Sequence, residues 1–181
     1  MEKAGSIQVY LEVGKKRVFA YALDWPGWCR SGKTEEAALE ALAVYRPRYA
    51  RVTSTASLSL PATHDSFEIV ERLPGTAGHT DFGAPGEIAA ADREPTTHEE
   101  AGRLAVLVSA AWATLDRIAA EAPAQLRKGP RGGGRDRDKL LEHVLGAEVA
   151  YARKLGIKHR QPTIGDRDAV AVLRSAILDV A

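Results

Sequence analysis

Residues 18–42 read VFAYALDWPGWCRSGKTEEAALEAL, and this stretch indicates the fold of the front of the chain. Its apolar start predicts a strand, and the Trp25–Lys33 segment predicts a loop. Thr34 is typical of a helix N-cap, because two glutamates follow it at the positive end of the helix dipole. Apolar residues then recur at helical spacing, so the stretch predicts a strand, a loop and a helix in that order.

The flanking residues extend this pattern on both sides. Ile7–Val13 alternates apolar and polar residues, and with Arg17–Leu23 it predicts a hairpin. Phe67–Leu73 alternates in the same way and predicts a further strand. Pro47 predicts that the helix ends or kinks at that point. Residues 1–73 are therefore expected to form a small antiparallel sheet with one packed helix.

The rest of the chain has a different pattern. Residues 74–96 are rich in glycine and proline, which predicts a long irregular connection between two regions. Residues 97–181 carry three helical patterns, so the whole chain is expected to belong to the α+β class. The expected starts of these helices are Thr96 or Thr97, Asp136 or Asp138, and Asp166. The last pattern continues to the final residue, which predicts that a fourth helix is missing.

Composition argues against several classes of protein. The 181 residues are 45% hydrophobic and 27% charged, which is ordinary for a globular chain. The formal net charge is +1, so a nucleic-acid partner is not expected. No apolar run approaches the roughly 20 residues that span a bilayer, and no signal peptide is recognisable, so a cytoplasmic protein is expected. The single cysteine, Cys29, leaves no pair for a disulfide.

The opening stretch resembles the HicB-like antitoxin domain. Members of this family show a strand, a D-x-P-G turn, a short strand, a G-x-T step and a helix that begins E-E-A. The matching residues here are Asp24, Pro26, Gly27, Gly32, Thr34, Glu36, Ala37 and Leu39. The resemblance covers about residues 5–73 and implies a β-β-β-α-β unit. It also implies a toxin partner and a DNA-binding segment, but no ribbon-helix-helix or helix-turn-helix pattern follows in this chain.

Gly27–Thr34 also fits the pattern G-x-x-x-x-G-K-[ST] of a loop that binds a nucleotide and its magnesium ion. Three features oppose this interpretation. Glu35 and Glu36 would place carboxylates where the phosphates belong. The preceding strand is expected in a hairpin rather than inside a parallel sheet, and no later apolar strand ends in aspartate. Nucleotide binding is therefore an alternative, with no nucleotide-binding residue favoured.

Residues 97–181 resemble part of a DinB-like four-helix bundle. The resemblance rests on His143 in the segment Leu140–Glu148, which fits L-x-H-x-x-x-x-E. It implies a divalent metal ion, zinc or nickel, held by three histidines, and the chemistry of a hydrolase or a thiol transferase. The other two family histidines form H-x-x-x-H, whereas no two histidines of this chain are four residues apart. His143 is thus a candidate ligand of an incomplete site, with a structural histidine as the alternative.

Basic and aromatic residues in two loops are candidates for binding. The candidates are Trp28, Arg30 and Lys33 in the first loop, and Arg131 and Arg135 in the glycine-rich loop before the second helix of the rear region. Trp25 is expected in the core, and Cys29 has no histidine and asparagine arrangement for nucleophilic catalysis. We therefore expect a binding or protein-interaction module without a complete catalytic site, either oligomeric or paired with a protein partner. A metal-dependent hydrolase or thiol transferase and a nucleotide-binding protein are the alternatives.

Overall fold

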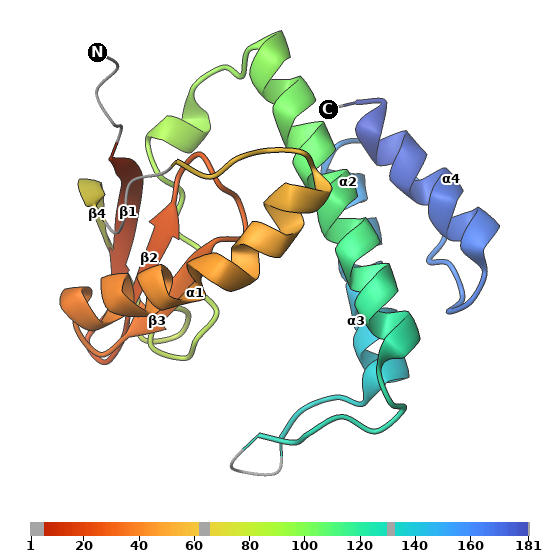
Figure 1. Cartoon of the computed structure of the whole chain (residues 1–181), viewed down its shortest axis with the longest axis horizontal. Helices are drawn as coiled ribbons and strands as arrows, with labels where there is room; N and C mark the ends of the chain where they lie inside the picture. Colours follow the sequence, from red (N-terminus) through yellow and green to blue (C-terminus); the bar gives the residue numbers. More distant parts are fainter. Residues whose placement is uncertain (1–5, 62–65, 130–132, 181) are drawn as a thin grey trace. The chain divides into compact units, whose positions relative to one another are not determined.

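The computed structural model describes residues 6–61, 66–129 and 133–180. The chain divides into two compact units, Met1–Thr97 and His98–Ala181. The first unit holds a four-stranded sheet and a long helix, and the second holds three helices (Figure 1). The α+β class that the sequence predicts is confirmed.

The sheet of the first unit has the strand order β3-β2-β1-β4. Its strands are β1 (Ile7–Val13), β2 (Val18–Ala22), β3 (Cys29–Gly32) and β4 (Phe67–Pro74). β1 and β2 form the predicted hairpin, and β2 pairs antiparallel with β3. β4 pairs parallel with β1, so the sheet is mixed rather than wholly antiparallel. The helix carries the chain from β3 at one edge to β4 at the other, and such a crossover connection places its two strands parallel.

The helix α1 (Glu35–Thr55) lies across one face of the sheet (Figure 1). It begins as predicted, because the Thr34 hydroxyl accepts a hydrogen bond from the N–H of Ala37 at 3.2 Å. It continues through Pro47 to Thr55 and does not end at the proline. Tyr49 and Thr53 are buried beyond that point, and their packing offsets the one backbone hydrogen bond that proline removes.

Apolar side chains from the sheet, from α1 and from the β2–β3 turn form the core of the first unit. They are Ile7, Val9, Leu11, Val18, Ala20, Ala22, Trp25, Trp28, Ala38, Leu42 and Tyr49. Side chains alternate along β1, so Leu11 contributes to this core while Glu12 belongs to the opposite face of the sheet.

Residues 74–96, which we call the strap, belong to the first unit. Beyond Pro74, which ends β4, they are irregular apart from a short 3-10 helix, Ala91–Arg93. Thr80 and Ala89 of the strap are completely buried. The Gly/Pro-rich composition therefore marks a segment that packs on the sheet of the first unit and has little regular structure of its own.

Glu12 holds the strap in place. Its carboxylate is completely buried and accepts a hydrogen bond from the Thr80 hydroxyl. The same carboxylate accepts hydrogen bonds from the N–H groups of Gly86 at 3.0 Å and Glu87 at 2.9 Å. A buried carboxylate needs such partners, and here backbone and hydroxyl donors of the strap provide them.

The second unit consists of α2 (His98–Glu121), α3 (Arg137–Lys154) and α4 (Arg167–Leu178). Its buried apolar cluster contains Val149, Ala152 and Leu173. Among the described residues, no helix combines the length and the apolar character that crossing a bilayer requires.

Candidate partner-binding surface

The turn from β3 to α1 fixes how closely the helix approaches the sheet. A Cβ atom on Gly32 would collide with the backbone of Ala37 and Ala38, so only glycine fits at this position. Gly27, in the turn before β3, has a φ of 89°, which glycine adopts without strain. These two glycines and the Thr34 cap account for the G-x-x-x-x-G-K-T pattern as elements of local structure.

The same residues form no phosphate-binding cradle. Cys29–Gly32 is an extended strand paired with β2, whereas a phosphate-binding loop curls its amides around the ligand. The Glu35 carboxylate lies in the first turn of α1 and pairs with Arg72 at 3.0 Å. Lys33 is exposed in the turn. This geometry argues against nucleotide binding at Gly27–Thr34.

The two tryptophans of the loop lie inside the molecule. Trp28 is 1% exposed and stacks on Tyr49 with ring centroids 5.6 Å apart. Its indole N–H donates a hydrogen bond to the backbone oxygen of Leu42 at 2.9 Å. Trp28, which the sequence suggested as a binding residue, therefore presents no exposed ring to a partner, and its burial comes with a partner for its N–H. Trp25 is buried as expected, edge-on to Tyr49.

Arg30 does lie at a surface, where β3 meets α1. Its guanidinium carbon is 3.0 Å from the centre of the Tyr45 ring, and the guanidinium carbon of Arg48 is 5.6 Å from the same centre. Neither arginine forms an ion pair with any carboxylate in the described ranges. We call Arg30, Tyr45 and Arg48 the arginine–tyrosine cluster. It places on one aromatic ring two positive charges that no described carboxylate pairs with.

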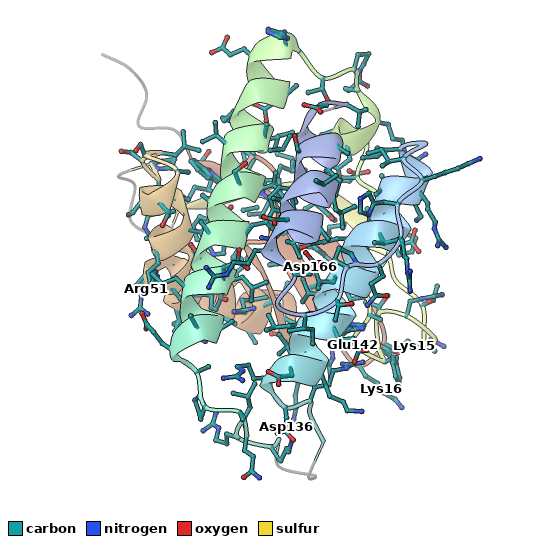
Figure 2. The ribbon with its side chains drawn as sticks, turned by 90° about the vertical axis from the view of Figure 1, so that its right-hand side faces the viewer. Lys15, Lys16, Arg51, Asp136, Glu142 and Asp166 are labelled. Atoms are coloured by element: carbon teal, nitrogen blue, oxygen red, sulfur yellow. The ribbon has the colours of Figure 1, made fainter. Side chains whose placement is uncertain are left out.

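The exposed face of α1 continues from this cluster, and its charges are segregated along the helix. We call this face the α1 stripe: Glu36, Glu40, Val44, Arg48 and Arg51. Its first two residues are acidic, its last two are basic, and Val44 between them is 76% exposed. Hydrogen bonds from its own backbone and from Thr34 hold the pKa of Glu36 below its usual value. Figure 2 shows Arg51 near the end of α1 and labels Lys15 and Lys16 in the β1–β2 turn.

Cys29 lies on the other side of β3 from Arg30, next to Tyr21 in the paired strand. Burial raises the pKa of its thiol to about 11. Tyr21 stacks on Tyr10 with ring centroids 4.5 Å apart, and burial raises the pKa of both phenols. A partly buried thiol with a raised pKa is a poor nucleophile at neutral pH.

His143 is exposed on α3, beside a shallow hollow that Arg135 also lines. The described residues contain no group of three His, Cys, Asp or Glu side chains that could hold a metal ion. Arg131, the other arginine predicted to bind in this unit, lies outside the described residues. The structure thus provides no set of ligands around His143 in the described part of the chain.

An apolar groove of about 840 Å³ lies among α2, α3 and α4. Arg174 at its wall pairs with Asp116 at 2.7 Å and with Glu148 at 3.3 Å. Its guanidinium also lies 5.0 Å from the centre of the Trp112 ring. Burial alone would lower the pKa of Arg174, but the two carboxylates more than offset this and raise it. The charges at this wall are therefore paired, unlike those of the arginine–tyrosine cluster.

The sequence pointed to Arg30 but missed Tyr45, Arg48 and Arg51. The available signal was the change from acidic to basic residues along the predicted helix, which places Glu36 and Arg51 at opposite ends of one face. Comparison of the chain with protein-family models, with curated proteins and with solved structures finds no significant match in any of the three.

Proposed function

We propose that this chain is a protein-interaction module whose first unit binds an acidic segment of a protein partner through the arginine–tyrosine cluster and Arg51. The observation that carries the proposal is the presence of two guanidinium groups on the Tyr45 ring without a carboxylate partner in the described residues. Two like charges in one place repel each other, and an incoming carboxylate relieves that repulsion. Arginine also binds carboxylates through two parallel hydrogen bonds, which favours it at interfaces.

The surroundings of the cluster support a binding role. Contacts with the Tyr45 ring restrict both guanidinium groups before any partner arrives, so less side-chain entropy is lost on binding. Val44 offers an exposed apolar contact on the same helix. Arginine and aromatic residues beside an apolar contact are typical of the residues that dominate binding energy at protein interfaces. The resemblance of residues 5–73 to HicB-like antitoxin domains supports the same proposal, because it implies a protein partner.

A charge-matched comparison tests the proposal. The native chain is titrated with a glutamate-rich peptide, and binding is followed by isothermal calorimetry at low salt. The Arg30→Ser/Arg48→Ser variant should bind at least tenfold more weakly. The Lys15→Ser/Lys16→Ser variant removes the same charge from the β1–β2 turn and should bind like the native chain.

Two results would count against the proposal. Equal losses in both variants would mean that the peptide responds to net charge and not to the cluster. A single-stranded oligonucleotide of the same charge that binds more tightly than the peptide, and depends on Arg30 and Arg48, would assign the surface to nucleic acid instead.

A further inference from the structure

The α1 stripe is complementary to itself when two copies are placed antiparallel. Val44 stands at its middle, with Glu40 four residues before it and Arg48 four residues after it. Glu36 and Arg51 lie eight residues before and seven residues after the same point. A two-fold axis through Val44 would therefore bring Glu40 of each copy to Arg48 of the other, and Glu36 of each copy to Arg51 of the other.

We propose that the partner of this surface is a second copy of the chain, joined through an antiparallel contact of the two α1 helices about Val44. This inference rests on the proposed function and names the source of the carboxylates: Glu36 and Glu40 of the second copy. Arg48 of each arginine–tyrosine cluster then pairs with Glu40 of the second copy. The two Val44 side chains pack against each other at the centre of the contact and are shielded from water there, and the ion pairs surround them.

Three observations favour a second copy. All five side chains of the stripe are exposed, so no described part of the first unit covers this face. Glu36 and Glu40 form no ion pair with a described cation, and Arg48 and Arg51 form none with a described carboxylate. The lowered pKa of Glu36 keeps that carboxyl ionised to lower pH. One helix thus provides both halves of a complementary interface.

The other edges of the first unit are less suited to self-association. β3 has only four residues, and β4 is interrupted by an irregularity in its pairing with β1. Short and bulged edge strands discourage pairing between sheets. β4 also presents the charged residues Glu68 and Arg72. The α1 stripe is therefore the favoured contact.

The contact should be weak and sensitive to salt. From Glu36 to Arg51 the stripe is about 22 Å long at roughly 1.5 Å per residue. A single helix face of this length buries less than the roughly 800 Å² per partner of a standard interface. Exposed ion pairs are screened by salt, with a Debye length of about 8 Å at physiological ionic strength. We expect a dimer with a dissociation constant on the order of 10 μM or weaker that dissociates further as salt is raised.

Charge-reversal variants of the full chain test the inference. In Glu40→Arg, arginine faces arginine across the two-fold axis, and in Arg48→Glu, glutamate faces glutamate. Each variant alone should dimerise at least tenfold more weakly than the native chain in sedimentation equilibrium at about 50 mM salt. An equimolar mixture should recover association, because the arginine introduced in one chain then meets the glutamate introduced in the other. The double variant should also dimerise, and Lys15→Glu should behave like the native chain.

The outcomes distinguish this inference from the proposed function on which it rests. A native chain that stays monomeric up to about 1 mM (roughly 4 kcal/mol of association), single variants that dimerise like the native chain, or a mixture that fails to associate would each overturn the antiparallel contact. The glutamate-rich peptide distinguishes the two proposals. If the dimer test fails but Arg48→Glu loses peptide binding while Glu40→Arg retains it, the basic surface still recognises carboxylates and only the second copy is wrong. If neither substitution changes peptide binding, the proposed function fails as well.

Discussion

Replacement of Glu12 tests the account of the strap most sharply. In Glu12→Gln the amide retains one acceptor oxygen, and its nitrogen must face either the Thr80 hydroxyl or the two N–H groups of Gly86 and Glu87. At least one hydrogen bond to a charged acceptor is lost, which costs about 1.5–3 kcal/mol, and the remaining bonds weaken with the charge. Glu12→Ala removes every acceptor and leaves the buried Thr80 hydroxyl without this partner. We expect losses of about 2–3 kcal/mol for the glutamine variant and about 3–5 kcal/mol for the alanine variant.

Urea unfolding followed by tryptophan fluorescence measures these losses. The measurement uses a Trp112→Phe background, because Trp25 and Trp28 then report on the first unit alone. Glu94→Gln is the matched control, since Glu94 is exposed in the same strap and should change the free energy of unfolding by less than about 0.5 kcal/mol. A Glu12→Gln variant as stable as this control would refute the assignment of Glu12 as the anchor of the strap.

Three further predictions concern individual side chains. Trp28→Ala should lower the free energy of unfolding by about 3–5 kcal/mol, through the cavity it leaves and the lost hydrogen bond to the Leu42 oxygen, and urea unfolding measures it; a loss below about 1 kcal/mol would show that the ring is not in the core. Alkylation of Cys29 at pH 8 should be about a hundredfold slower in the folded chain than in urea, because raising the pKa from 9.0 to about 11 lowers the fraction of thiolate by about the same factor. The rate in the folded chain should increase with pH up to about pH 11. A native rate equal to the unfolded one would contradict this. Arg174→Met should lower the thermal stability of the second unit by about 1–3 kcal/mol, because Glu148 loses its partner in a nearly buried position, whereas the exposed Arg167→Met should be neutral; circular dichroism melting curves of the two variants make the comparison.

Local patterns in the sequence predicted most of the first unit. Alternation gave the β1–β2 hairpin, and Thr34 with its two following glutamates gave the start of α1. The direction of β4 could not be predicted in the same way, because alternation indicates which face a side chain takes and says nothing about strand orientation. The parallel pairing follows from the crossover through α1, which is a property of the whole fold.

Two residues are buried by segments that follow them in the sequence. Trp28 lies near a glycine and a proline, which favoured a loop and a binding role, but its ring packs against Tyr49 of α1. Glu12 lies on the face of β1 opposite the core, and only the strap from residues 74–96 makes that face buried. Burial by a segment distant in the sequence leaves no periodic signal in the strand that it covers.

The candidate surface was only half visible from the sequence. Arg30 stood out as a basic residue in a loop, whereas Arg48 directly follows Pro47, where the helix was expected to end or kink, and a charged residue on a helix usually indicates a solvated face. The contact of Arg30 with Tyr45 depends on the approach of α1 to β3 that Gly32 permits, whereas Arg48 reaches the same ring from one turn further along α1. The segregation of charge along α1 could be seen in the sequence. That the charged face is complementary to itself could be inferred only once the structure showed Val44 exposed at its centre.

The position of the bound carboxylates tests the central claim most directly. In a chain labelled with ¹⁵N, the side-chain Nε–Hε resonances of Arg30, Arg48 and Arg51 can be followed while the glutamate-rich peptide is added. The account predicts that these resonances move together with saturation, and that the Nε–Hε resonance of Arg17 in the first unit stays in place. Shifts spread evenly over all arginines, or confined to the second unit, would contradict the proposal that the surface formed by β3 and α1 is the binding site.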